Sequence, residues 1–153
     1  MKRFVDVCGA LIGLIVVSPI LLVAAVLIWC QDGHSPFYIA PRVGNNGRLF
    51  NMVKLRSMII GADKTGVDST AGDDPRITRV GYFVRRFKLD EFTQLWNVLR
   101  GEMSLVGPRP NVKRETDLYT PIERRLLKVS PGVTDFASIV FADENDILEN
   151  SGD

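Results

Sequence analysis

Histidine and cysteine are scarce in this chain of 153 residues, which contains one histidine and two cysteines. A single histidine, His34, argues against a catalytic triad and against any mechanism that needs a histidine base. Cys8 and Cys30 both lie in the first apolar stretch, where cysteine behaves as a small hydrophobic residue. We therefore expect neither a disulfide framework nor a zinc site.

Charge is absent over a long N-terminal stretch, because no charged residue occurs from Val7 to Cys30. This stretch is longer than the about 20 residues that span a bilayer and the apolar core of about 7–15 residues in a signal peptide. Ser18-Pro19 interrupts it near the middle, and proline bends or breaks a helix because it lacks the N–H donor. Ser18 can then hydrogen-bond a carbonyl that the break has freed.

Basic residues flank both ends of this stretch. Lys2 and Arg3 precede it, and the residues that follow it include Arg42, Arg48, Lys54 and Arg56. Because positive residues favour the cytoplasmic side of a membrane, the flanks indicate a helix that enters the bilayer and returns. A single-pass helix is the alternative.

Turn residues divide the segment that follows. Glycine and proline indicate a loop over Gln31–Pro41 at the membrane surface, and Asn46-Gly47 favours a tight hairpin whose returning strand is Leu49–Leu55. Lys54 and Arg56 lie two residues apart, so on a strand they would share a face and present two cations to a phosphate. The alternative is a solvated basic edge strand.

A polar stretch, Gly61–Pro75, is predicted to be a loop that could act as a lid. Asp73-Asp74 within it could bind a metal, although such a pair is more often solvated. Ile77–Phe87 carries apolar residues at helical spacing among arginines that include Arg85 and Arg86, which predicts a basic amphipathic helix. Such a helix would lie at an anionic membrane surface, face a diphosphate, or pack as an ordinary core helix.

The central stretch, Phe87–Pro110, predicts a helix, a stop and a rigid loop. One apolar face is formed by Phe92, Leu95, Trp96, Val98 and Leu99, and Gly101 suits the left-handed residue after the last turn.

Asp90 and Glu91 fall in the first turn of this predicted helix, where the helix dipole favours negative charge. Adjacent helical residues point about 100° apart, so the two carboxylates can hold different roles, such as nucleophile and acid–base or metal support. We expect Asp90 to stay ionised because of the dipole and of nearby Arg85 and Arg86. The alternative is two carboxylates that merely start a helix.

The stretch ends in Gly107-Pro108-Arg109-Pro110, where two prolines fix the backbone on either side of Arg109. A guanidinium held in this way suits bidentate recognition of phosphate, and a proline-rich turn with a solvated arginine is the alternative. Asn111–Tyr119 predicts a short polar helix. Thr120-Pro121-Ile122-Glu123 matches a capping box that starts a further basic amphipathic helix, which Pro131-Gly132 ends.

Taken together, residues 85–110 resemble the core signature of the bacterial sugar transferases, the monotopic phosphoglycosyl transferases that act on polyprenyl phosphate. Supporting blocks are Arg42-Val43-Gly44, Lys54–Met58 and Asp74–Gly81, and the resemblance runs from Lys2 to about Gly132. It implies a helix–break–helix anchor at Ser18-Pro19. It also implies transfer of a phospho-sugar from a UDP-sugar to polyprenyl (undecaprenyl) phosphate, the first membrane step in assembling polysaccharide, O-antigen or glycoprotein.

The resemblance also implies roles for individual residues. Asp90 would be the nucleophile that forms a covalent intermediate and a ligand of Mg²⁺, and Glu91 would assist it. Phosphate binding would fall to the residues Lys54, Arg56, Arg85, Arg86, Pro108, Arg109 and Pro110. After Pro131-Gly132 the residues depart from the family pattern, so the sugar specificity does not carry over, and the chain ends sooner than many members, as it would without a terminal helix.

We therefore predict an α+β protein, mainly α, with a re-entrant membrane helix over residues 1–31 and a cytosolic-face catalytic domain over residues 32–153. That domain would contain amphipathic interfacial helices and a short β-hairpin, at the cytoplasmic face of a bacterial inner membrane and without a nucleic-acid partner. Two alternatives are a non-catalytic basic module that binds anionic lipid and a metal-dependent transferase that uses direct displacement. The sequence does not define the sugar, the nucleotide base, the polyprenol length, the pathway or the oligomeric state.

Overall fold

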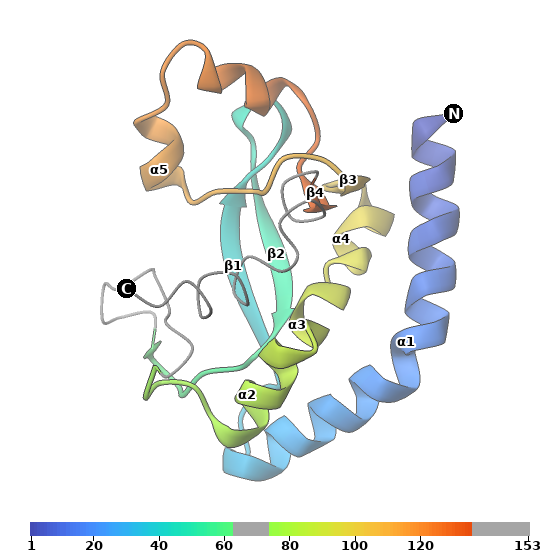
Figure 1. Cartoon of the computed structure of the whole chain (residues 1–153), viewed down its shortest axis with the longest axis vertical. Helices are drawn as coiled ribbons and strands as arrows, with labels where there is room; N and C mark the ends of the chain where they lie inside the picture. Colours follow the sequence, from blue (N-terminus) through green and yellow to red (C-terminus); the bar gives the residue numbers. More distant parts are fainter. Residues whose placement is uncertain (63–73, 136–153) are drawn as a thin grey trace, which may run out of the picture.

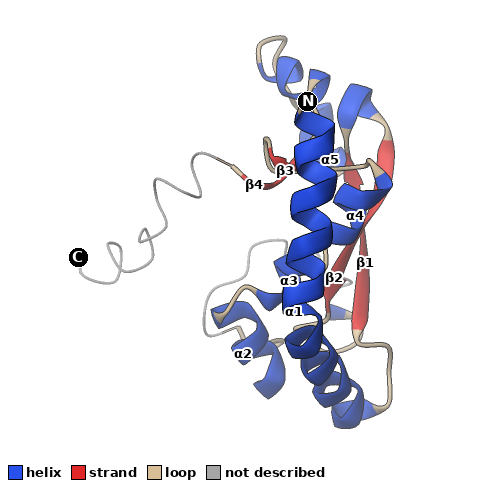
Figure 2. Cartoon of the chain, turned by 90° about the vertical axis from the view of Figure 1, so that its right-hand side faces the viewer, coloured by secondary structure: helices blue, strands red, loops and turns tan. Residues whose placement is uncertain are grey.

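The structure is a computed structural model that describes residues 1–62 and 74–135. Its helices and strands are α1 (Lys2–Asp32), β1 (Phe37–Val43), η1 (Asn45–Gly47), β2 (Leu49–Leu55), α2 (Arg79–Arg86), α3 (Leu89–Phe92), α4 (Leu95–Arg100), β3 (Ser104–Val106), α5 (Lys113–Asp117), η3 (Glu123–Lys128) and β4 (Gly132–Thr134). Figures 1 and 2 show that α1 lies along one side of α3 and α4, while the hairpin of β1 and β2 lies on their other side. The helix-rich architecture with a small β region agrees with the predicted class. The division at residue 31 stays a prediction.

Helix α1 bends sharply about half-way along its length (Figure 1). Pro19 lies inside the helix and offers no N–H to the carbonyl of Ile15 four residues earlier. The hydroxyl of Ser18 donates to that carbonyl instead, at 2.9 Å. The predicted break at Ser18-Pro19 is therefore confirmed as a bend, and membrane re-entry stays a prediction.

The outer face of α1 is apolar and uncovered. Ile12, Ile15, Val16 and Leu22 are each more than half exposed, whereas the small Ala10 is fully buried against the rest of the protein. Within the described part of the chain, α1 is the one helix long and apolar enough to cross a membrane. So large an exposed apolar surface marks a face that contacts lipid or protein.

Charged side chains hold the first turns of α1 to the C-terminal end of α4 and to β3. The guanidinium of Arg3 donates to the carbonyls of Val98 and Leu99 at 2.6 and 3.0 Å, which places a cation at a helix C-terminus. Asp6 is buried and accepts hydrogen bonds of 2.9–3.1 Å from the Ser104 hydroxyl and the Leu105 N–H.

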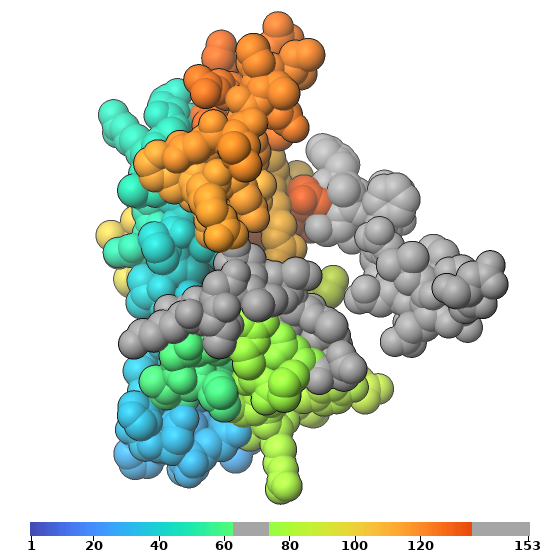
Figure 3. Space-filling view, turned by 90° about the vertical axis from the view of Figure 1, so that its left-hand side faces the viewer, coloured from blue at the N-terminus to red at the C-terminus, as the bar shows by residue number. Residues whose placement is uncertain are grey.

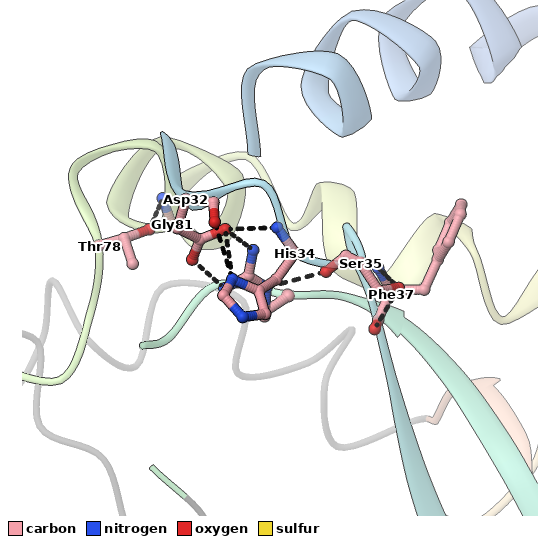
Figure 4. Close-up of polar contacts among 7 residues, drawn as sticks. Asp32, His34, Ser35, Phe37, Thr78 and Gly81 are labelled. Atoms are coloured by element: carbon pink, nitrogen blue, oxygen red, sulfur yellow. Dashed lines mark hydrogen bonds and ion pairs between the residues drawn. The ribbon is translucent and has the colours of Figure 1, made fainter. Parts of the chain in front are cut away.

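The last turn of α1 is held at the opposite end of the same domain. Asp32 forms a bidentate ion pair with Arg56, whose Nε donates to the carbonyl of Ser35 at 2.9 Å. Figure 4 shows Asp32, His34 and Ser35 gathered in this turn, which begins at the left-handed Gly33 (φ 72°). Both ends of α1 thus contact the domain that carries the rest of the chain.

The predicted hairpin is confirmed. β1 and β2 pair antiparallel from Phe37↔Leu55 to Val43↔Leu49, and the turn between them contains Asn46 and Gly47, both with positive φ. The predicted loop over Gln31–Pro41 is partly wrong, because β1 begins at Phe37. Proline is compatible with an edge strand, and each strand of a two-stranded sheet is an edge.

The predicted basic helix after the polar loop is observed as α2. The hydroxyl of Thr78 caps it by accepting from the Gly81 N–H at 2.9 Å (Figure 4). Val84 is fully buried, but Phe83 and Phe87 are more than half exposed and contact each other, with ring centroids 4.5 Å apart and ring planes tilted by 49°. The core-facing stripe is therefore narrower than the predicted apolar face.

The predicted central helix is divided into α3 and α4 by Thr93 and Gln94. Leu95 and Val98 are buried, whereas Trp96 is 52% exposed, so the predicted apolar face is only partly a core face. Gly101 has φ 85° and ends α4, as predicted.

The C-terminal part contains a strand pair that the sequence did not predict. β3 and β4 are parallel, with Ser104↔Gly132 and Val106↔Thr134. The capping box is confirmed, because the Thr120 N–H donates to Glu123 at 2.8 Å and the Glu123 N–H to Thr120 at 3.3 Å. The helix it starts is the 3₁₀-helix η3, and Figure 3 shows the segment of α5 and η3 (orange) beside the hairpin (cyan). The predicted lid over Gly61–Pro75 falls mostly outside the described residues.

Candidate active site

Asp90 of α3 faces Lys54 of β2 at the centre of the domain. The Lys54 Nζ lies 3.9 Å from the Asp90 Oδ2, and only 21% and 16% of the two side chains are exposed. Burial raises the pKa of Asp90, and the nearby Lys54 cation opposes that shift. Burial likewise lowers the pKa of Lys54, which Asp90 opposes. The two pKa values therefore approach each other, a pattern that is common where groups take part in chemistry.

The predicted cause of Asp90 ionisation needs correction. Burial, which favours the neutral carboxyl, is the largest influence on the pKa of Asp90. Lys54, and not the pair Arg85 and Arg86, is the main cation that favours the carboxylate, with Arg85 making a smaller contribution. Glu91 raises the pKa further, because a second negative charge lies next to it.

Two side chains spaced one helical turn apart, Thr93 and Asn97, hold Asp90 and Lys54 in position. The Thr93 hydroxyl lies 2.9 Å from the Val53 carbonyl and 2.8 Å from the Asp90 carbonyl. The fully buried Asn97 accepts from the Val53 N–H at 3.0 Å and donates to the Asn51 carbonyl at 2.8 Å. These contacts satisfy backbone N–H and carbonyl groups on the edge of β2 that does not pair with β1. They also hold α3 against Val53, the residue before Lys54.

A cavity of about 530 Å³ lies beside this pair. Its wall contains four cationic residues, namely Arg42, Lys54, Lys88 and Arg109. It also contains the acidic residues Glu91, Glu115 and Asp135, and segments of α3, the hairpin, the loop before α5, and β4. A hollow with this number of cations suits an anionic ligand that carries more than one phosphate.

The loop that carries Arg109 is held by β4 as well as by its prolines. The Gly132 N–H donates to the Pro108 carbonyl, and the Gly107 N–H donates to the Thr134 carbonyl, both at 3.0 Å. A Cβ on Gly132 would overlap backbone atoms of Gly107, so only glycine permits this approach. The predicted rigidity therefore depends on a contact between distant parts of the sequence.

The structure brings some of the predicted site residues together and leaves others apart. Lys54, Asp90, Glu91, Arg109 and Pro110 lie at or beside the cavity. Pro108, Arg85, Arg86 and Arg56 are not among the residues that line it.

Arg56 does not share a face with Lys54, because it lies beyond the end of β2 and is bound to Asp32. Sequence reasoning did not assign a site role to Arg42 or Lys88, or a positioning role to Thr93 or Asn97. For Arg42 a signal was available, because it belongs to the block Arg42-Val43-Gly44 that supports the family resemblance.

Magnesium fits the donor set at this site. Mg²⁺ prefers hard oxygen ligands and is often held by one or two carboxylates together with substrate phosphates. Asp90 and Glu91 provide two neighbouring carboxylates beside the cationic cavity. Among residues 1–62 and 74–135 there is no group of three or more His, Cys, Asp or Glu that would hold a metal without such help.

The sequence of the whole chain decides the family. The sequence model described as "Bacterial sugar transferase" matches residues 1–151. The chain belongs to the bacterial sugar transferase family. Both the Asp90–Lys54 pair and the Arg109 loop fall within the matched residues.

Several curated proteins of known name are similar to this sugar transferase. "Galactosyl transferase CpsE" of Streptococcus agalactiae serotype III is 40% identical over 146 residues, covering 87% of this chain and 32% of the relative. "UDP-galactose-lipid carrier transferase" of Erwinia amylovora is 38% identical over 149 residues, covering 88% and 31%. "UDP-N-acetylgalactosamine-undecaprenyl-phosphate N-acetylgalactosaminephosphotransferase" of Aeromonas hydrophila is 35% identical over 143 residues, covering 92% and 34%. The chain spans about a third of the length of each.

Proposed function

We propose that this sugar transferase moves a phospho-sugar from a UDP-sugar to undecaprenyl phosphate, with Asp90 as the covalent nucleophile. The observation that carries the proposal is the partly buried Asp90, 3.9 Å from Lys54, beside a cavity whose wall also contains Arg42, Lys88 and Arg109. The relatives' names point to lipid carriers and sugar phosphates. Phosphoryl transfer needs positioning and charge neutralisation more than elaborate covalent machinery, and this site offers both.

In the first step, a carboxylate oxygen of Asp90 would attack the phosphorus next to the sugar. A bond from this oxygen to phosphorus forms as the bond to the nucleoside monophosphate breaks, and UMP leaves with the bonding electrons. In the second step, an oxygen of undecaprenyl phosphate attacks the same phosphorus and displaces the Asp90 carboxylate. The product is undecaprenyl diphosphate sugar, and the enzyme regains its original state.

The surrounding residues would each support these steps. Lys54 favours the ionised, nucleophilic form of Asp90, while burial keeps that carboxylate poorly solvated and basic. Arg109, held by its loop, would bind the diphosphate as a fixed fork. Glu91 would take the proton from undecaprenyl phosphate or orient Asp90. Mg²⁺ held by Asp90 and by the diphosphate oxygens would lessen the repulsion between the two anions.

We also propose that α1 is a re-entrant anchor at the cytoplasmic face of the inner membrane. Its uncovered apolar face, its bend at Ser18-Pro19 and the ties at both of its ends support this topology. A helix that crossed the bilayer would carry Arg3 and Asp32 to opposite sides, whereas both side chains bind the same polar domain. The exposed aromatic residues Tyr82, Phe83 and Trp96 would lie at the membrane surface.

Incubation with donor alone tests the covalent step. A set of UDP-sugars should yield one that releases about one UMP per active site without lipid and leaves a phospho-sugar on the protein, detected by intact-protein mass spectrometry. Asp90→Asn should abolish both the burst and the adduct, because an amide is neither anionic nor nucleophilic. Complete turnover with lipid but no adduct would favour direct displacement. No UMP release with any donor, combined with binding to anionic vesicles, would favour the non-catalytic lipid-binding module.

Cysteine labelling tests the anchor. Single cysteines placed before and after Val7–Cys30, in a background without Cys8 and Cys30, should both label from the cytoplasmic side. Labelling from opposite sides would disprove re-entry. Pro19→Ala should favour a straight helix, because it restores the N–H donor to the Ile15 carbonyl.

A further inference from the structure

Lys88 has an unfavourable backbone conformation in the wall of the cavity. Its φ and ψ are 52° and 27°, in the left-handed region. Among the described residues, Asn46 in the hairpin turn is the other residue besides glycine with positive φ, at 55°. Asparagine is among the residues that tolerate this region, whereas a lysine there suffers a clash between its Cβ and the backbone. A strained residue at a candidate site is a reason to look for a function.

The backbone turn at Lys88 does not itself require a lysine. Its N–H donates to the Arg85 carbonyl and its carbonyl accepts from the Glu91 N–H, both at 3.0 Å, which directs the chain from α2 into α3. Glycine would adopt the same dihedral angles with no clash. The local geometry therefore accounts for the turn but not for the presence of a long cationic side chain.

The side chain has a position that can account for it. Lys88 is exposed and lines the cavity together with Glu91, Arg42 and Arg109. Within the described part of the chain, no carboxylate lies within ion-pair distance of its ammonium, although Glu91 follows three residues later. By contrast, Lys54 in the same wall faces Asp90. Lys88 thus offers the cavity a positive charge that no described protein carboxylate neutralises.

We propose that Lys88 is a phosphate-binding residue of this cavity, and that its charge is gained at the expense of fold stability. The inference rests on the proposed function, which supplies two phosphate ligands: the diphosphate of the donor and the single phosphate of the polyprenyl acceptor. An ammonium on a flexible stem suits either as a point charge. The proposal therefore predicts that binding and stability respond in opposite directions to loss of the side chain.

Three substitutions separate charge from strain. Lys88→Met removes the charge and keeps the Cβ, Lys88→Arg keeps both, and Lys88→Gly removes both. Asn46→Gly is the matched control, because it relieves a left-handed residue outside this cavity. Binding should be measured by calorimetry in detergent, with UDP as the probe for the donor and farnesyl phosphate as the probe for the acceptor. Thermal unfolding of the same samples gives the stability.

We expect the dissociation constant for at least one probe to rise about three- to tenfold in Lys88→Met and Lys88→Gly, and to stay within about twofold in Lys88→Arg and Asn46→Gly. Lys88→Gly should raise Tm by about 1–3 °C, whereas Lys88→Met and Lys88→Arg should not. A weaker affinity for UDP alone would assign Lys88 to the donor, and for farnesyl phosphate alone to the acceptor.

Two results would overturn the assignment while leaving the proposed function intact: wild-type protein that binds a probe which Lys88→Met binds equally well, or a Lys88→Gly variant that is no more stable than wild type. Wild-type protein that binds neither probe would instead overturn the proposed function, and this inference with it. The binding results of the wild type therefore distinguish the two failures.

Discussion

Replacing the buried Asn97 by aspartate should destabilise the fold strongly, although the two side chains have almost the same shape. The Asn97 oxygen accepts from Val53 N–H at 3.0 Å, and aspartate preserves that bond. The Asn97 nitrogen donates to the Asn51 carbonyl at 2.8 Å and to Glu102 Oε2 at 2.7 Å. In Asn97→Asp an oxygen would face both of these acceptors.

The magnitude follows from these contacts. A buried acceptor that loses its donor costs about 1–3 kcal/mol. The Asn51 carbonyl loses its Asn97 donor outright, while the cost at Glu102 is smaller, because 23% of its side chain is exposed and it also pairs with Arg100 at 3.4 Å. Burying a second carboxylate beside Glu102 adds a repulsion, so we expect a total loss of about 3–5 kcal/mol. For a protein of this size that corresponds to a fall in Tm of roughly 10 °C.

Thermal unfolding in detergent at several pH values tests this reasoning. The loss should be smaller at pH 5 than at pH 8, because one proton between the two carboxyl groups restores a hydrogen bond. Asn51→Asp is the control, since it adds the same charge on an exposed side chain of β2. A loss below about 1 kcal/mol for Asn97→Asp, or an equal loss for Asn51→Asp, would refute the argument.

Three further predictions concern the site itself. Arg109→Lys keeps the charge but loses the planar fork, so kcat/KM should fall about tenfold or more while Tm stays unchanged, because the side chain is exposed; near-normal turnover would indicate a long-range role. Gly132→Ala should lower both Tm and activity, with a loss of stability above about 2 kcal/mol because its Cβ would meet backbone. The control for Gly132→Ala is Gly47→Ala in the hairpin turn, whose Cβ would meet nothing within 4 Å and which should cost only about 1 kcal/mol from its positive φ. A plot of the rate of UMP release against pH should be bell-shaped and narrower than the ordinary pKa values of aspartate and lysine would give. The reaction needs Asp90 ionised and Lys54 protonated, and the pKa of Asp90 is raised while that of Lys54 is lowered. A rate that already reaches its plateau at the ordinary pKa of an aspartate would contradict this assignment.

The sequence by itself determined those features that depend on neighbouring residues. Proline lacks an N–H in any structural context, so the dipeptide Ser18-Pro19 was enough to predict the bend of α1 and the hydrogen bond of Ser18 to a freed carbonyl. Asn46-Gly47 similarly predicted the hairpin turn, since few residues accept positive φ. The family followed from a long motif that needs no three-dimensional information.

Local patterns predicted the candidate site only in part. Asp90, Glu91 and Arg109 were expected because of their residue types and their places in the motif. The spacing of Lys54 and Arg56 was misleading, because alternation holds only inside a strand and β2 ends at Leu55. Beyond that point Arg56 forms an ion pair with the carboxylate of Asp32, which is distant in the sequence.

Tertiary structure alone decided the environment of the catalytic candidate. Burial of Asp90 and its approach to Lys54 depend on how α3 packs on β2, which Thr93 and Asn97 fix through hydrogen bonds to strand backbone. Such bonds join residues about forty positions apart in the chain, so no periodicity records them. The same holds for β4, which holds the Arg109 loop through Gly132, and for the two ends of α1. A local pattern specifies what a segment can become, whereas the pKa of a carboxyl and the direction of a guanidinium depend on which distant segments surround them.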